Sequence, residues 1–332
     1  MTIARAHTNI ALIKYWGKKD PTLIIPYANS LSLTLDQFYT TTEVTFADEA
    51  AHQDEFILNG QRLAPKATTR LAAFLELIRQ RARVQRYFKV KSENHVPTAA
   101  GLASSASGFA ALALAASTTA GLQLSSRDLS RLARRGSGSA CRSIFGGFVE
   151  WHKGYDDQTS YAEPLQADQH VAMDIGMLAL IISDQPKQIS SRKEMANTVA
   201  TSPFYDAFIQ ACEQDMIILK QAITQNDFVT LGQIAESNAM KMHATTMGAQ
   251  PPFSYFLPET IQAIQAVQRV RREGLDCYYT MDAGPNVKVI GRASELETLQ
   301  VRLTELLPNT PMVAARPGPG AMLLSDFEFG QE

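Results

Sequence analysis

Apolar and polar residues repeat with two different periods along the first half of the chain, and each period predicts a different element. Residues 41–46 alternate between polar and apolar, and residues 55–63 contain the Asn59-Gly60 turn signal, a pattern typical of half-buried antiparallel strands. After Pro65, apolar residues recur at helical spacing up to residue 82, which predicts an amphipathic helix. Further strands are predicted at residues 87–92, 146–151 and 176–183, the last apolar enough to be central.

The second half of the chain is predicted to contain long helices with strands between them. A polar run at residues 184–188 follows the apolar strand that ends at Ser183, so we expect one domain over residues 1–185 and another over residues 186–332. Because crossover helices do not regularly separate the strands, the pattern favours an α+β fold of two lobes with mostly antiparallel strands. Helices are predicted at residues 205–224, 228–247, 259–273 and 294–306, and strands at 278–281, 287–290 and 312–315.

One stretch has no charged residue between His95 and Arg127 and is longer than a membrane span. Proline, serine and threonine interrupt it, and the continuous apolar run over residues 108–116 is too short to cross a bilayer. We therefore expect a loop followed by a buried helix. The first residues contain no long apolar segment, so no secretory signal is expected.

Composition and charge exclude several classes of protein. The 332 residues correspond to two domains at roughly 150 residues each, and 45% apolar with 19% charged residues is ordinary for a soluble globular chain. The 31 basic and 33 acidic residues leave a net charge of −2, which gives no reason to expect nucleic acid or an anionic membrane as partner. Three widely spaced cysteines without CxxC predict neither a disulfide framework nor a zinc site, and favour a reducing cytoplasm.

The small residues of segment 97–108, PTAAGLASSASG, follow a predicted strand and open a predicted helix. Small side chains let the backbone approach a ligand, and N–H groups at a helix start attract anions, so the segment is a candidate phosphate-binding loop. Ser104, Ser105 and Ser107 add hydroxyl groups, and a hydroxyl can ligate magnesium beside nucleotide phosphates. The alternative is a small-residue loop packed under a helix, and the segment lacks the lysine of a Walker A motif.

Lysines and large aromatic residues lie together in segment 9–19, NIALIKYWGKK. Tyr15 and Trp16 favour burial, whereas the lysines need water or an anion, a conflict that is resolved if a cation is held at the edge of a pocket. The alternative is a strand end with solvated lysines, which we prefer for Lys19. The three lysines are Lys14, Lys18 and Lys19.

Two further segments contain groups that bind or activate substrates in other enzymes. Segment 134–147 repeats glycine and serine around Arg142, which suits a second anion cradle of N–H groups, hydroxyls and one guanidinium, or else a plain turn. Asp282 directly follows a predicted strand and precedes a Gly-Pro turn. A carboxylate held there can orient a substrate hydroxyl or take its proton, and it can equally cap the turn.

These four segments, in this order, resemble motifs of the mevalonate diphosphate decarboxylases in the GHMP kinase superfamily. The resemblance implies an α+β, two-lobed GHMP kinase-like fold, with a lobe like the second domain of ribosomal protein S5, including a left-handed βαβ unit, and a C-terminal GHMP-type α/β sandwich lobe. It places the active site between the lobes. The motifs are NIALIKYWGK at residues 9–18, PTAAGLASSASG at 97–108, GSGSACRSIFGG at 136–147 and MDAGPN at 281–286.

The resemblance also implies a reaction, in which ATP with magnesium phosphorylates the 3-hydroxyl of mevalonate 5-diphosphate, and loss of phosphate and carbon dioxide gives isopentenyl diphosphate. Asp282 matches the catalytic aspartate, Lys18 best matches a lysine beside it, and Arg142 is expected to bind the substrate carboxylate. The residues that match substrate-binding segments are Tyr15, Trp16, Gly17, Lys18, Arg70, Ser137, Gly138, Ser139, Ala140, Cys141, Arg142, Ser191 and Arg192. Those expected to bind ATP are Ala100, Gly101, Leu102, Ala103, Ser104, Ser105, Ser107 and Lys187, with Ser105 nearest the metal.

Two alternatives stay open beside this interpretation. One is a related enzyme on the same fold, either a decarboxylase of the monophosphate or a mevalonate 3-kinase; the other is a catalytically silent nucleotide-binding relative. The joint presence of Asp282 and Lys18 argues against the silent relative. The expected partners are the two phosphorylated substrates and, by family resemblance, a second copy of the chain in a homodimer. We expect the protein in the cytoplasm, and neither a nucleic acid nor a membrane as partner.

Overall fold

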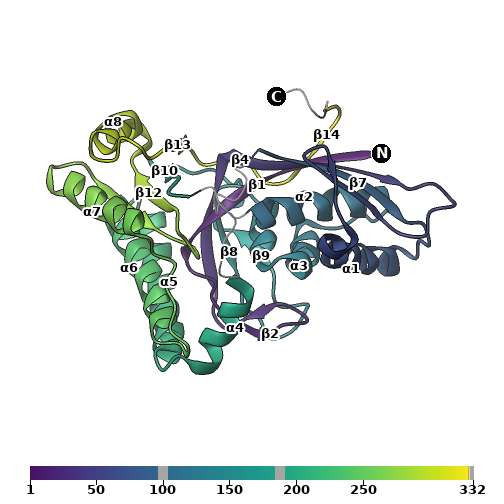
Figure 1. The fold of residues 1–332 in the computed structure, drawn as a ribbon, viewed down its shortest axis with the longest axis horizontal. Coiled ribbons are helices and arrows are strands. Elements are labelled where there is room, and N and C mark those ends of the chain that lie inside the picture. The colour runs from purple at the N-terminus through teal and green to yellow at the C-terminus, as the bar shows by residue number, and fades with distance from the viewer. Residues whose placement is uncertain (96–103, 184–190, 328, 330–332) are drawn as a thin grey trace.

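The computed structural model describes residues 1–95, 104–183, 191–327 and 329, and it arranges them in two lobes, each built around its own sheet (Figure 1). Among these residues the first sheet has eight strands in the order β14-β1-β4-β7-β5-β6, with β8 paired to β4 and β9 to β8. Its strands are β1 (Thr2–Ile13), β4 (Ser30–Phe46), β5 (Glu55–Leu58), β6 (Gln61–Arg62), β7 (Phe88–His95), β8 (Phe148–Trp151), β9 (Ala162–Pro164) and β14 (Met322–Leu324).

Three helices form the helical layer of the first lobe: α1 (Pro65–Ala82), α2 (Ser104–Thr119) and α3 (Ser126–Gly136). Helix α2 packs against β1 and β4, and α1 and α3 pack against α2. Alanines and other small residues of α2 are buried there, so the buried helix predicted from the uncharged stretch is confirmed, while residues 96–103 lie outside the described part. A 3₁₀ helix, η1 (Gly138–Ile144), follows α3. Strands β5 and β7 are parallel and enclose α1 in sequence, which makes a βαβ unit.

The second lobe contains an antiparallel sheet in the order β11-β12-β10-β13, covered by long helices that run side by side in Figure 1. Helices α5 (Tyr205–Thr224) and α6 (Phe228–Met247) begin and end where the periodicity predicts. The remaining elements are β10 (Gly176–Leu180), β11 (Cys277–Thr280), β12 (Val287–Gly291), β13 (Met312–Ala315), α4 (Ser191–Thr201), α7 (Pro258–Arg272), η2 (Ala293–Glu295) and α8 (Leu296–Leu306).

Strands β1 and β4 connect the two lobes. Ile10 and Leu12 of β1 and Leu31 and Leu33 of β4 lie in the same buried cluster as side chains of α5 and α6. The first six residues of β4, SLSLTL, alternate between polar and apolar and are all buried, so both faces of this part of the strand are covered. Only its end, residues 41–46, was predicted from the sequence. The ends of these strands therefore belong to both lobes, and residues that follow β1 reach the second lobe.

Strand pairing also bears on the expected domain boundary after residue 185. Strand β10 pairs with β12 and β13 of the second sheet, and β14, near the end of the chain, returns to pair with β1 of the first. A boundary after residue 185 would separate β10 from its own sheet, so the pairing supports a division between Pro164 and Gly176. Polar residues 184–188 that suggested the boundary lie outside the described residues.

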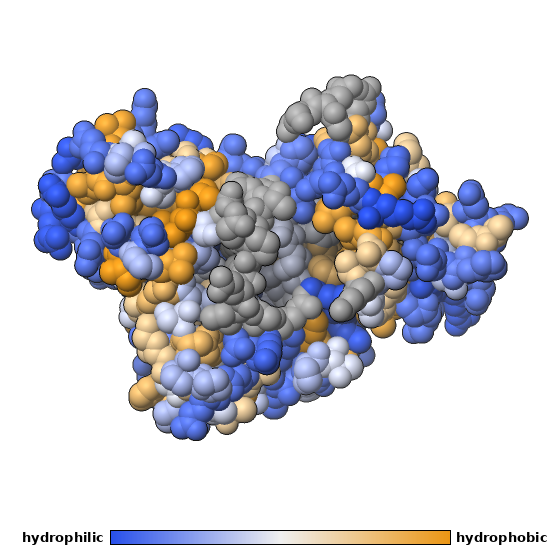
Figure 2. Space-filling model, viewed as in Figure 1, coloured by the Kyte–Doolittle hydropathy of each residue, from blue (hydrophilic) through white to orange (hydrophobic). Residues whose placement is uncertain are grey.

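Hydrophobic and hydrophilic residues are interspersed on both lobes of the face in Figure 2. Within the described ranges, every helix is too short or too polar to cross a membrane.

Candidate active site

A buried ion pair joins the lobes where β1 ends. The Lys14 ammonium nitrogen Nζ lies 2.9 Å from Oδ1 of Asp282 and donates a second hydrogen bond, 2.7 Å long, to the carbonyl oxygen of Ala11. Only 1% of the Lys14 side chain is exposed, against 26% for Asp282. Burial lowers the pKa of Lys14, and the charge of Asp282 opposes that shift. The pair thus presents a carboxylate to the solvent side with a cation fixed behind it.

The lysine that the structure places against Asp282 is Lys14, and the expectation that Lys18 takes this position is corrected accordingly. Lys18 instead begins the short strand β2 (Lys18–Asp20), which pairs with β3 (Ile25–Pro26), and its side chain is half-buried. The sequence contained a signal for the right residue, because Lys14 directly follows the apolar end of β1 and is carried into the interior with it.

Arg142 lies in η1 and is held by neutral oxygen atoms. Its Nε donates to Oδ1 of Asn9 at 3.1 Å and to Oγ of Ser32 at 2.9 Å, and its Nη1 donates to Oγ of Ser30 at 2.6 Å. Burial lowers the pKa of Arg142, which is 2% exposed, but a guanidinium stays protonated in proteins. The nearby charge of Asp282 opposes this lowering, while the hydrogen bonds of Arg142 in the described ranges go to neutral oxygen atoms, so its charge can also attract an anionic ligand.

Two predicted anion-binding segments meet near this arginine. The hydroxyl oxygens of Ser105, in the first turn of α2, and Ser137, just before η1, lie 3.3 Å apart. Asn9 of β1 holds η1 in place, because its Nδ2 donates to the Ser139 carbonyl at 3.0 Å and to Ser143 Oγ at 2.7 Å. Sequence reasoning did not select Asn9 as a site residue, although it opens the NIALIK motif.

Several residues expected to bind substrate have side chains that are buried in the core. Ala140 and Cys141 are fully buried in η1, and burial raises the pKa of the Cys141 thiol to about 12. Trp16 is 4% exposed and belongs to the core, where its ring meets Tyr255 edge to face. Their side chains therefore face the interior, and only the backbone of these turns is left for a ligand.

Tyr15 and Gly138 pack together beside η1. A Cβ atom on Gly138 would lie 2.8 Å from the Tyr15 ring, and that ring also packs on Trp151 with centroids 4.7 Å apart. Gly17 has φ of +113°, and Tyr205 Oη donates a 2.8 Å hydrogen bond to the carbonyl of the preceding Trp16. These contacts bring the YWGK and SGSACR motifs into one neighbourhood.

Arg70 reaches the site from α1. Its Nε donates to the Gly136 carbonyl at 2.9 Å, its Nη2 donates to the same oxygen, and the guanidinium lies 4.3 Å from the centre of the Phe109 ring. These contacts place Arg70 at the residue that ends α3, one position before Ser137. Arg70 therefore holds the start of the predicted anion cradle.

The predicted ATP-binding residues are divided. Ser104 and Ser105 are exposed at the start of α2, whereas Ser107 is fully buried, 2.8 Å from Thr40 Oγ1, so its hydroxyl faces the sheet rather than a ligand. Ser191 is half-buried in the first turn of α4. Outside the described residues lie Ala100, Gly101, Leu102, Ala103 and Lys187, and nothing is described of the Arg192 side chain.

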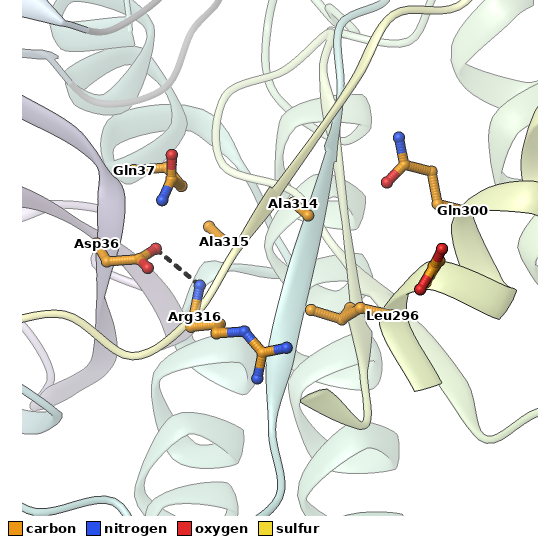
Figure 3. A pocket seen from close by; sticks show the side chains of 8 residues that line it. Asp36, Gln37, Leu296, Gln300, Ala314, Ala315 and Arg316 are labelled. Carbon is orange, nitrogen blue, oxygen red and sulfur yellow. Dashed lines mark hydrogen bonds between the residues drawn. The ribbon is translucent and has the colours of Figure 1, made fainter. Parts of the chain in front are cut away.

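A separate hollow of about 280 Å³ lies between β4, β13 and α8 (Figure 3). Asp36 accepts a 2.8 Å hydrogen bond from the backbone N–H of Arg316 at its edge. Its lining contains none of the predicted site residues; the lining residues are Asp36, Gln37, Leu296, Glu297, Gln300, Ala314, Ala315 and Arg316.

The two-lobed fold, the lysine–aspartate pair between the lobes and the buried arginine hydrogen-bonded to neutral oxygens are typical of an enzyme that acts on small anionic substrates. Family models agree: one for the diphosphomevalonate decarboxylase-like N-terminal domain matches residues 6–162, and one for the mevalonate 5-diphosphate decarboxylase C-terminal domain matches residues 177–317. The chain belongs to the mevalonate diphosphate decarboxylase family.

Known relatives match nearly the whole chain. The diphosphomevalonate decarboxylase mvd1 of Aspergillus fumigatus is 36% identical over 333 residues, which cover 93% of this chain and 82% of that protein. A solved mevalonate diphosphate decarboxylase structure from Enterococcus faecalis is 51% identical, covers 97% of this chain and 98% of its own, and superposes with a TM-score of 0.92. Another solved structure, 52% identical with the same coverage and TM-score, is a complex with MVAPP, AMPPCP and magnesium.

Proposed function

We propose that this chain catalyses the ATP-dependent decarboxylation of mevalonate 5-diphosphate to isopentenyl diphosphate, with release of ADP, phosphate and carbon dioxide. Family membership supports the reaction, and relatives with MVAPP and the ATP analogue AMPPCP support the two substrates. The observation that carries the proposal is the Lys14–Asp282 pair, 2.9 Å long, which sets a partly exposed carboxylate between the lobes.

Asp282 is proposed to orient the substrate 3-hydroxyl and to accept its proton. As the O–H bond breaks, the oxygen attacks the γ-phosphorus of ATP, and the bond from that phosphorus to the ADP oxygen breaks. The ammonium of Lys14 favours the ionised form of Asp282, which is the form able to take a proton. A hindered tertiary alcohol needs this alignment more than it needs a covalent enzyme intermediate.

Decarboxylation follows from the phosphorylated intermediate. The C3–O bond breaks and phosphate leaves with its electron pair; the bond from C2 to the carboxylate carbon then breaks, and its electrons form the new double bond as carbon dioxide departs. Arg142 is proposed to hold the substrate carboxylate before this step. Its three hydrogen bonds to Asn9, Ser30 and Ser32 orient the guanidinium without neutralising it.

The residues described fit a magnesium ion that arrives with the nucleotide. No group of three or more acidic, histidine or cysteine side chains in the described residues forms a cage for a metal. Ser105 presents an exposed hydroxyl at the N-terminus of α2, and Mg²⁺ commonly takes few protein ligands together with phosphate oxygens and water. Ser105 would hold the ion, which would neutralise charge on the phosphates.

The test is release of carbon dioxide from mevalonate 5-diphosphate and, separately, from the 5-monophosphate, each with ATP. We expect release from the diphosphate, with one ADP formed for each carbon dioxide. Release from the monophosphate alone would identify the related decarboxylase, and ADP without carbon dioxide would identify a 3-kinase. Absence of both products would contradict the proposal and favour the silent relative.

The homodimer expected from the family resemblance remains a prediction. Light scattering of the purified chain at micromolar concentration distinguishes the 36.5 kDa monomer from twice that mass.

A further inference from the structure

We propose that Asn238 of α6 is a positioning residue for Lys14, and through it for the Asp282 carboxylate; this rests on the role proposed above for that pair. Asn238 is fully buried, and its Oδ1 accepts a 2.8 Å hydrogen bond from the backbone N–H of Lys14. Lys14 comes one residue after Ile13, the last residue of β1, which pairs with Leu31 of β4. The side chain of Asn238 thus accepts a hydrogen bond from the first backbone N–H that follows β1.

The amide of Asn238 is itself held in one orientation. Its Nδ2 donates to Oδ2 of Asp215 at 2.9 Å, and a carboxylate only accepts hydrogen bonds, so the amide oxygen must face Lys14. Asp215, on α5, is 4% exposed, and both of its oxygens accept from Lys241 Nζ at 2.9 and 2.8 Å. The chain of contacts runs from an ion pair at the edge of α5 and α6 to the backbone of Lys14.

The position of the Lys14 backbone decides where its ammonium lies. The ammonium has two short hydrogen bonds, to the Ala11 carbonyl and to Asp282, and the residue is buried between the lobes. If the backbone N–H loses its acceptor, the turn after β1 relaxes and the ammonium moves relative to the carboxylate. A displacement of about 1 Å at a reacting group lowers turnover by up to about 100-fold.

Asn238→Leu replaces the amide with an apolar side chain of similar size and removes its hydrogen bonds to Lys14 and Asp215, together with the longer one, 3.6 Å, from Nδ2 to Cys212 Sγ. We expect kcat for carbon dioxide release to fall about 10- to 100-fold, with KM for both substrates within about threefold of the wild-type values. The matched control is Thr245→Val, because Thr245 is equally buried on α6 but its hydroxyl, among the residues that the structure describes, bonds only to the Met242 carbonyl of its own helix. Its kcat should stay within about twofold of wild type.

Two variants of Asp215 separate positioning from bulk stability. Asp215→Asn keeps an oxygen that accepts from Asn238 and should retain kcat within about threefold, whereas Asp215→Leu removes the acceptor and should follow Asn238→Leu. If Asn238→Leu is folded by circular dichroism and has wild-type kcat, or if Thr245→Val loses as much, the proposal is overturned.

A measurement that does not need turnover keeps the proposal testable if the proposed reaction fails. Lysine-selective NMR follows the titration of Lys14, whose charged or titratable neighbours are Asp282, Arg142 and His243. In the wild-type background, Asp282→Asn should lower the pKa of Lys14, because it removes the opposite charge. In the Asn238→Leu background the same change should have less than half that effect, and equal effects in both backgrounds would refute the coupling.

Discussion

At the scale of single residues, burial controls the charge of the lysine behind the candidate base. Burial lowers the pKa of Lys14 below the ordinary lysine value of 10.5, and a lysine is charged only below its pKa. Activity that depends on the ammonium is therefore present below the lowered pKa and lost as the pH rises through it. We expect the alkaline limb of the kcat profile, measured at saturating substrates, to fall at a lower pH than an exposed lysine would give. A kcat that stays constant up to pH ~10 would contradict this.

Asp282 is the residue on which kcat should depend most. We expect Asp282→Asn to lower kcat about 100- to 10,000-fold with little change in substrate binding, because an amide cannot take the hydroxyl proton. Stopped assays of carbon dioxide and calorimetric binding of mevalonate 5-diphosphate measure the two effects.

The matched control for this substitution is Asp276→Asn. Asp276 precedes β11, and its 2.7 Å ion pair with Arg292 is partly exposed. The control should leave kcat unchanged. Near-normal turnover of Asp282→Asn with unchanged binding would remove Asp282 from the role of base.

At the scale of elements, the turn between β1 and β2 depends on a glycine. Gly17 has φ of +113°, and a Cβ there would lie 1.8 Å from Tyr205 Oη. Gly274 has φ of +106° with open space around it, so Gly274→Ala should cost only about 1–2 kcal/mol from the backbone conformation. Gly17→Ala should cost about 1–3 kcal/mol more from the overlap, and should raise KM for mevalonate 5-diphosphate through the neighbouring Tyr15. Urea unfolding and steady-state kinetics test this pair, and equal costs would contradict it.

The first turn of α2 contains both exposed and buried serines. Ser105 is exposed, whereas Ser107 is buried against Thr40 with 2.8 Å between the hydroxyl oxygens. We expect Ser105→Ala to raise KM for ATP about tenfold, since a hydrogen bond to a charged group contributes about 1.5–3 kcal/mol. Ser107→Ala should lower the free energy of unfolding by about 1 kcal/mol and leave KM for ATP nearly unchanged. The reverse outcome would show that Ser107 is the ligand.

At the scale of the whole molecule, two buried histidines should make the fold sensitive to acid. Burial, aided by Arg5, lowers the pKa of His7 to about 4, and burial, aided by Lys14, lowers that of His243 to about 3. Unfolding exposes both to water, where their pKa returns to about 6.5, so the unfolded state binds more protons as the pH falls below that value. Stability is therefore lost as the pH falls from 6.5 toward 4.

Between pH ~7 and ~5, each of these histidines should remove about 2 kcal/mol from the free energy of unfolding. His243→Phe, which keeps a ring between Tyr255 and Phe256, should abolish its share, as measured by urea unfolding at the two pH values. His52→Gln, at an exposed position, should change nothing. The same loss of stability in wild type and His243→Phe would contradict the assignment.

Much of the fold follows from local patterns. Helices α5 and α6 begin and end at the predicted residues, and α2 is the buried helix expected from the uncharged stretch, because periodicity and composition depend on residues close together in the chain. The prediction of β4 is incomplete: only its end was predicted, although its first half, SLSLTL, also alternates between polar and apolar residues. Alternation does not show that both faces of this half are buried, which contacts with both lobes decide.

The sequence by itself determined the family, because the four motifs and their order can be recognised without a structure. It also identified Asp282 and Arg142 as residues of the candidate site. Only the tertiary structure decided that Lys14 is the lysine that meets Asp282, across a sequence separation of 268 residues, and that Ser107 and Trp16 face the interior. It also placed β10 with the second sheet and β14 with the first. The physical reason is that periodicity reports which face of an element is buried, whereas the partner that covers this face is set by packing between elements far apart in the chain.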